Sequence, residues 1–190
     1  MKTKSSPPAP TKRARPKKAR PRRRKVKIFI SHSRRDASLV RLIIDLLRTS
    51  DIHEDEIRCT SVPPYGLPVG ADIDVIRAEI AKCKILLAVI TKDALDSLHV
   101  LLELGAGWGL GKTLVPITGP GIHLEGLPLW LSAKHGMSWN HQECWEDFNR
   151  DVFRPLKKTL KHKRRFASVI QKLIKWQPVE IEEGQKEQAK

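Results

Sequence analysis

Short apolar runs alternate with amphipathic helical patterns along residues 26–118, and this alternation restricts the fold more than any other feature of the sequence. The expected strands are 25–31, 56–61, 84–90 and 113–118, and the expected helices are 36–48, 72–82 and 96–106. The unbroken apolar run 85–90 is typical of a strand covered on both faces. Strands and helices that alternate in this order predict an α/β fold with a doubly wound parallel sheet.

Functional residues are expected where the strands end, because doubly wound sheets bind ligands beyond the carboxyl ends of their strands. These ends are the segments 31–33, 61–70, 91–98 and the residues after 118. The loop 62–70 contains three prolines and two glycines, a composition that excludes regular secondary structure.

Positive charge is concentrated at the two ends of the chain. The net charge is +15, yet residues 1–27 hold 13 Lys and Arg and no acid, residues 28–156 have a net charge of −4, and residues 157–190 have a net charge of +6. The mildly acidic body argues against a basic nucleic-acid-binding fold. The five prolines among the Lys and Arg of residues 1–25 predict a disordered basic arm. Such an arm can bind nucleic acid, an acidic protein partner or anionic lipid, or it can be a solubilising tail, and the sequence leaves these alternatives open.

The remainder of the chain is expected to be irregular over 119–140, helical over 141–176 as a C-terminal extension, and a polar tail over 177–190. Core packing is the default interpretation of the apolar stripe in the extension, which consists of Trp145, Phe148, Val152 and Phe153. The sequence has no apolar run near the roughly 18 residues that a membrane span needs, and no signal peptide. With three cysteines at no disulfide spacing, it predicts a cytoplasmic protein.

Two motifs that suggest a cofactor do not fit their surroundings. The run 106–113 matches a loosened P-loop pattern, but it follows a helix and precedes a strand, whereas a P-loop joins a strand to a helix. His135, His141 and Cys144 form no recognisable metal-binding set. We therefore expect no metal and no bound cofactor.

Glu103 is the one carboxylate within an almost wholly apolar helical segment, and an unpaired carboxylate buried there is costly. It can form a salt bridge, with Arg77 or Lys112 as partners, or it can face the crevice beside the strand ends. The spacing of the residues leaves both alternatives open.

Three segments together resemble the TIR (Toll/interleukin-1 receptor-like) domain, in particular its bacterial stand-alone branch. They are Ile-Phe-Ile-Ser-His-Ser at 28–33, the Pro- and Gly-rich loop at 59–70, and Ser97 through Glu103-Leu-Gly-Ala. The likeness covers roughly residues 25–120. It implies the flavodoxin-like TIR fold, with a TIR domain at 26–140.

The resemblance also implies an activity, because many TIR domains cleave NAD⁺ at the nicotinamide–ribose bond. It implies Glu103 as the catalytic carboxylate and NAD⁺ as a substrate rather than a cofactor. The positions implied to bind NAD⁺ are Phe29, Ile30, Ser31, Ser33, Arg34, Tyr65, Gly66 and His99. Enzymatic members often have Trp at the position of His99, which puts the efficiency of this site in question.

The function implied is an NAD⁺ glycohydrolase, with cyclisation or ADP-ribosyl transfer as further outcomes. The resemblance suggests an effector or signal generator of bacterial anti-phage or stress defence that is activated by self-association through TIR–TIR contacts. The alternative is a non-catalytic TIR–TIR scaffold, with the basic arm tethering it to nucleic acid or an acidic partner.

Overall fold

The structure is a computed structural model, which describes residues 25–66, 73–128, 131 and 136–178. Most of the expected basic arm, the second half of the loop 62–70 and the expected polar tail lie outside these residues. None of the described helices is long and apolar enough to span a membrane.

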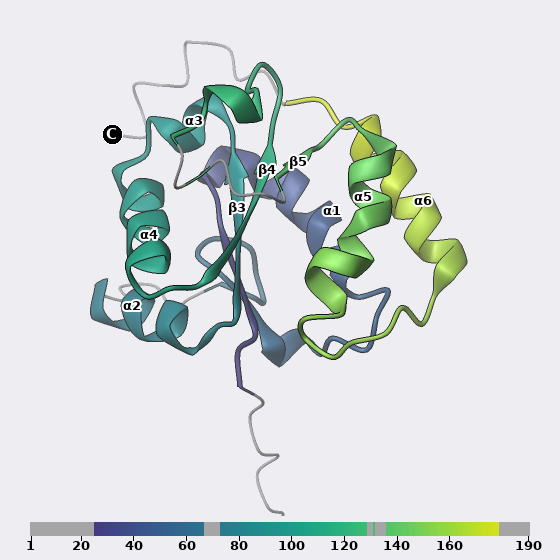
Figure 1. Ribbon diagram of the computed structural model, residues 1–190, viewed down its shortest axis with the longest axis horizontal. Coiled ribbons are helices and arrows are strands. Elements are labelled where there is room, and N and C mark those ends of the chain that lie inside the picture. Colours follow the sequence, from purple (N-terminus) through teal and green to yellow (C-terminus); the bar gives the residue numbers. More distant parts are fainter. Residues whose placement is uncertain (1–24, 67–72, 129–130, 132–135, 179–190) are drawn as a thin grey trace, which may run out of the picture.

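Five parallel strands form one sheet in the order β2-β1-β3-β4-β5 (Figure 1). The strands are β1 (Ile28–Ser31), β2 (Ile57–Cys59), β3 (Ile85–Ile90), β4 (Thr113–Thr118) and β5 (Met137–Ser138). The doubly wound α/β sheet is thereby confirmed. The fifth strand falls in a region that we expected to be irregular. It has two residues, which pair with Ile117 and Thr118, and so short a strand has no periodicity of its own.

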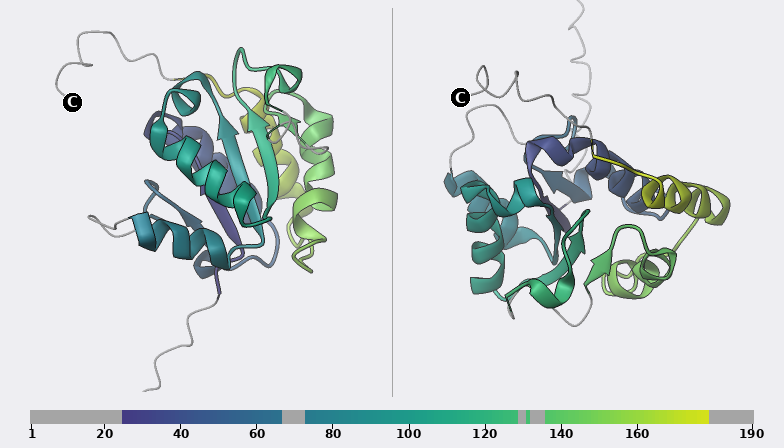
Figure 2. Two further views of the ribbon diagram at one scale, coloured as in Figure 1. Left: turned by 60° about the vertical axis from the view of Figure 1, so that its left-hand side comes forward. Right: turned by 90° about the horizontal axis from the view of Figure 1, so that it is seen from above.

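Helices cover both faces of the sheet (Figure 2). They are α1 (Ala37–Leu47), α2 (Ile73–Lys82), α3 (Lys92–Leu95), α4 (Leu98–Gly109), α5 (Gln142–Phe148) and α6 (Lys163–Ile174), with short helical turns at Arg34–Asp36, Glu54–Glu56, Leu124–Gly126 and Asn149–Phe153. The helix expected at 96–106 begins at Leu98, because the Ser97 hydroxyl caps it by accepting a hydrogen bond from the Val100 amide.

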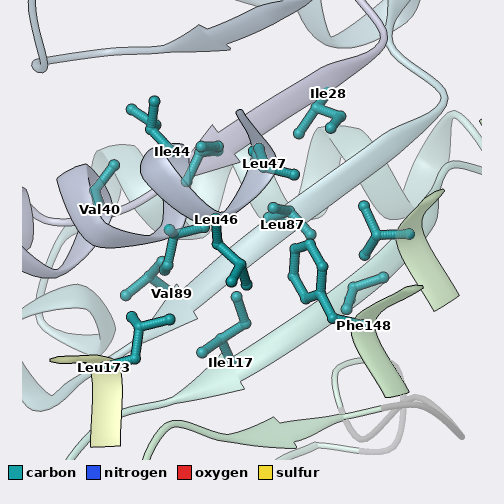
Figure 3. Close-up of a cluster of buried hydrophobic side chains, with 14 of the residues drawn as sticks. Ile28, Val40, Ile44, Leu46, Leu47, Leu87, Val89, Ile117, Phe148 and Leu173 are labelled. Carbon is teal, nitrogen blue, oxygen red and sulfur yellow. The ribbon is translucent and has the colours of Figure 1, made fainter. Parts of the chain in front are cut away.

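The two faces of the sheet contribute to two separate hydrophobic clusters. Side chains of α1, α5 and α6 pack on one face, against strand residues such as Ile28, Leu87 and Ile117 (Figure 3). Side chains of α2, α3 and α4 pack on the other face, against strand residues such as Phe29 and Leu86. Alternate residues of each strand therefore belong to different clusters, as the two-residue period of a strand requires.

The helical extension completes the first of these clusters. Trp145, Phe148, Val152 and Phe153 are fully buried, and the rings of Phe148 and Phe153 meet edge to face with centroids 5.5 Å apart. Helix α6 also packs along α1. The stripe that the sequence placed by default in a core does lie in one, and the extension shares its core with the sheet.

Candidate active site

A buried hydrogen bond joins β1 to α4 at the carboxyl end of the sheet. The hydroxyl of Ser31, the last residue of β1, donates to Oε2 of Glu103 over 2.6 Å. Ser31 is fully buried, and Glu103 is 4% exposed. The carboxylate therefore lies at the strand ends, as one of the two alternatives from the sequence had it, but it is buried between α4 and β1 and does not face an open crevice.

The salt bridge that was the other alternative is not formed. Arg77 instead pairs with Asp74 on the exposed surface of α2. The ammonium group of Lys112 donates to the carbonyl of Ala81 over 2.6 Å. Among the described residues, Ser31 is the side chain that hydrogen-bonds to Glu103.

The small residues of α4 let the helix approach the sheet closely. A Cβ atom at Gly107 would collide with the side chain of Leu86 on β3. Gly107 lies four residues after Glu103, so the two occupy the same side of the helix. The close approach at Gly107 therefore also positions the Glu103 carboxylate against the end of β1.

Burial dominates the electrostatics of Glu103. Removal from water raises the pKa of its carboxyl from 4.5 to about 7, even though the hydrogen bond from Ser31 acts in the opposite direction. Near neutral pH the group is therefore divided between its acid and its carboxylate form. The negative charge of Glu103 also acts on Cys59, the last residue of β2. Burial is the main cause that raises the pKa of this thiol, and Glu103 raises it to a smaller extent.

His32 and Ser61 form a second polar pair, at the ends of β1 and β2. The Nδ1 of His32 lies 3.2 Å from the Ile30 carbonyl, and its Nε2 lies 2.7 Å from the Ser61 hydroxyl. A carbonyl can only accept, so Nδ1 bears the proton and the Ser61 hydroxyl donates to Nε2. Burial lowers the pKa of His32, which is consistent with this neutral ring.

Asp36 and Thr91 form a third pair, between the start of α1 and the end of β3. The hydroxyl of Thr91 donates to Oδ2 of Asp36 over 2.7 Å and accepts from the Ala94 amide over 3.1 Å. Burial raises the pKa of Asp36, with the Thr91 hydrogen bond opposing it. Polar side chains thus gather where three neighbouring strands end, the edge at which doubly wound sheets bind their ligands.

The structure brings together only part of the predicted NAD-binding set. Ser31 contacts Glu103, and His99 lies on the surface of α4 one turn before it. Phe29 and Ile30 are fully buried in the two hydrophobic clusters. Their side chains support the sheet and offer no surface to a ligand.

The other predicted residues lie around this edge on turns. Ser33 is half-buried and accepts a hydrogen bond from the Arg35 amide, and Arg34 is exposed. Tyr65 packs against the cluster on the α1 face, and its carbonyl accepts from the Cys59 amide. Gly66 is the last described residue of its loop.

His32, Ser61 and Thr91 lie within the strand-end segments in which the sequence placed functional residues, although none of the three was singled out as a site residue. Asp36 lies outside those segments and was missed. The pairing of these residues was not readable, because it depends on which strands become neighbours. In the described part of the chain, no group of three or more His, Cys, Asp and Glu side chains is arranged to hold a metal ion.

Comparison with known proteins identifies the fold. No family model matches the chain. An uncharacterized protein from Bacillus subtilis (strain 168), YddK, is 31% identical over 83 residues, which are 43% of this chain and 31% of YddK. The chain therefore matches less than a third of the length of that relative.

A solved structure matches a larger part of the chain. The TIR domain of the Toll-related receptor TRR-2 from Hydra magnipapillata aligns with 68% of this chain and 97% of its own length, with a TM-score of 0.52 and 18% identity. Identity this low relates the two by fold alone. The five-stranded parallel sheet and its surrounding helices have the fold of a TIR domain.

Proposed function

We propose that this protein hydrolyses NAD⁺ at the nicotinamide–ribose bond, with Glu103 as the catalytic carboxylate. The observation that supports this most directly is the buried Ser31–Glu103 pair at the ligand-binding edge of a TIR fold. A carboxylate at 4% exposure with one hydroxyl partner is costly to maintain for stability alone. The enzyme would act on the cytoplasmic NAD⁺ pool, as an effector or signal generator of bacterial anti-phage or stress defence.

A single carboxylate is sufficient for this reaction. Nicotinamide in NAD⁺ is a cationic pyridinium. When the C1′–N bond breaks, its electron pair stays on the ring nitrogen and nicotinamide leaves as a neutral molecule, so no acid is needed. The positive charge that develops on the ribose is stabilised by the ionised Glu103. A water molecule then attacks C1′, and a carboxylate of pKa about 7 is well suited to accept its proton.

Buried Glu103 has to become accessible before it can contact a ribose. Activation by self-association supplies a physical route, since contact with a second copy can stabilise an opened arrangement of α4. The exposed large apolar side chains support such contact. They are Ile73, Val75, Leu98, Leu101, Leu102, Trp108 and Leu110, all on or directly after α2 and α4.

The same apolar surface supports the second candidate function, a non-catalytic scaffold that acts through TIR–TIR contacts. Leu98 is 75% exposed and Leu102 is 57% exposed, which is unusual for leucines of a single helix. Self-association is common to both candidate functions, and NAD⁺ turnover distinguishes them.

The test measures nicotinamide release from NAD⁺ over a series of protein concentrations, with products separated by chromatography. Wild type is compared with Glu103→Gln and with a matched control, Glu143→Gln, which changes an exposed glutamate on α5. We expect release by wild type and the control and none by Glu103→Gln, with specific activity rising with concentration. If all three proteins are inactive even when they are associated, the scaffold function replaces the enzyme. The second product distinguishes hydrolysis from cyclisation or transfer.

A further inference from the structure

The end of the sheet opposite the candidate site joins two basic segments that are far apart in the sequence. Lys27 immediately precedes β1, and Glu56 immediately precedes β2, so both lie at the amino ends of the strands. The Lys27 ammonium pairs with Oε1 of Glu56 at 2.8 Å, and the Lys158 ammonium pairs with Oε2 at 2.7 Å. One buried carboxylate therefore holds the end of the basic arm beside the segment that leads into α6.

That second segment presents a dense patch of positive charge. The residues Lys161, His162, Lys163, Arg164 and Arg165 are all exposed, and together they line one depression on the surface. One of these cations, Arg165, pairs with Asp45 on α1 at 3.4 Å. In Figure 1 the strands run upward from this end of the molecule, and the first turn of α6 lies toward the same end.

The placement of this charge does not serve the stability of α6. A helix N-terminus has a partial positive charge, so cations there are unfavourable and acids are favoured. The first turn of α6 has no acidic residue, and His162 makes no side-chain capping bond. An anion bound here would accept hydrogen bonds from the amides of the first turn and would neutralise the cationic side chains.

We propose that the patch 161–165 binds the phosphate backbone of nucleic acid, independent of base sequence, and that the positive charges of residues 1–27 add to its affinity. Residues 1–27 supply 13 positive charges, and the last of them, Lys27, shares the Glu56 carboxylate with Lys158. Six of the cations in the arm are arginines, whose forked donors match phosphate oxygens. Because the surface lies at the amino ends of the strands, bound nucleic acid leaves the carboxyl edge free.

The lack of large apolar side chains in the patch and in residues 1–25 favours nucleic acid over a lipid surface as the ligand. Peripheral membrane segments insert apolar side chains in addition to their charges. Residues 1–25 contain no Val, Ile, Leu, Phe, Trp or Tyr. The exposed large apolar side chains of the described residues lie at α2 and α4 and none is in the patch.

The test measures binding of the full chain to a fluorescein-labelled mixed-sequence 24-base-pair DNA duplex by anisotropy, over a range of KCl concentrations. We expect the dissociation constant to rise steeply with salt for wild type. The variant Lys161→Gln/Lys163→Gln/Arg164→Gln/Arg165→Gln should bind about tenfold more weakly, with a log–log salt slope smaller by roughly 0.9 for each phosphate that the variant no longer neutralises. Combining it with Arg22→Gln/Arg23→Gln/Arg24→Gln should weaken binding further.

The control is Lys172→Gln/Lys175→Gln, which removes two exposed cations at the other end of α6, half the number removed from the patch. We expect it to retain most of the wild-type affinity, and circular dichroism with thermal melting shows whether each variant is folded. A folded patch variant with wild-type affinity and slope overturns the proposal, as does a control that weakens binding as much as the patch variant for each charge removed. Tighter binding to phosphatidylserine vesicles than to the duplex at equal salt would also overturn it, in favour of a membrane tether. NAD⁺ turnover plays no part in these measurements.

Discussion

The hydroxyl of Ser31 and the carboxylate of Glu103 are 72 residues apart in the chain and 2.6 Å apart in the structure. This hydrogen bond opposes the effect of burial, which raises the pKa of Glu103 to about 7. Ser31 therefore favours the ionised form of the group that we propose to be catalytic. It also fixes which oxygen of Glu103 remains for a ligand.

Substitution Ser31→Ala should make Glu103 harder to ionise. Loss of a hydrogen bond to a charged group costs about 1.5–3 kcal/mol, so the pH midpoint of NAD⁺ cleavage should rise by about 1 or more. Activity at pH 7 should fall about tenfold and recover in part at pH 9. The measurement is kcat/KM against pH for both proteins. An unchanged midpoint would show that Ser31 does not act on the ionisation of Glu103.

Glu103 should make the protein less stable as pH rises. Its pKa in the folded state, about 7, lies above the unfolded value of 4.5, so its contribution is fully present below pH 4.5 and is lost as pH rises through about 7. The loss amounts to about 3 kcal/mol. Glu103→Gln should therefore be more stable than wild type at pH 8.5 and similar to it at pH 5. Urea unfolding at the two pH values tests this, and equal differences at both would contradict it.

Glu56 should act with the opposite sign. Burial alone would raise its pKa, but hydrogen bonds from Lys158, Lys27 and the His53 amide outweigh it and lower the pKa to about 2. The resulting stability, about 3 kcal/mol, is present above pH 4.5 and is lost as pH falls through about 2. Glu56→Gln should destabilise the protein by about 3 kcal/mol or more at pH 7, because the buried Lys158 loses its counter-charge. Urea unfolding with a loss below 1 kcal/mol would contradict this.

Two glycines of α4 should respond in opposite directions to the same change. Gly107→Ala places a methyl group against the side chain of Leu86 and should cost about 1–3 kcal/mol, whereas Gly105 has open space around it. Gly105→Ala should stabilise the helix by about 0.5–1 kcal/mol. Thermal unfolding compares the two variants. Only Gly107→Ala should also reduce NAD⁺ cleavage, because it moves the segment that positions Glu103.

Charge on the exposed face of α4 should prevent self-association. Leu102 is 57% exposed, so Leu102→Glu has little effect on the fold and interrupts the apolar surface. We expect analytical ultracentrifugation to show less association than for wild type, and NAD⁺ cleavage to lose its dependence on concentration. Arg41→Glu, at an exposed position on α1, is the control. Unaltered association of the Leu102 variant would place the contact elsewhere.

Local pattern was sufficient for much of the fold. The continuous apolar run that forms β3 is readable because a strand covered on both faces has no polar residues to interrupt it. The stripe at 145–153 is readable because a helix repeats every 3.6 residues. Strand β5 could not be predicted from the sequence, because its two residues are a strand only through their pairing with β4.

The candidate site divides in the same way. The sequence by itself determined that Glu103 is exceptional, since a lone carboxylate in an apolar helix is unusual wherever that helix packs. Only the tertiary structure decided that its partner is Ser31 and not Arg77 or Lys112, and that Phe29 and Ile30 lie in the core. The physical reason is that such contacts depend on strand order and on the approach of α4 to the sheet, which are set by packing between distant segments. A pattern along the chain predicts which residues are buried, but it does not predict which of the buried residues contact one another.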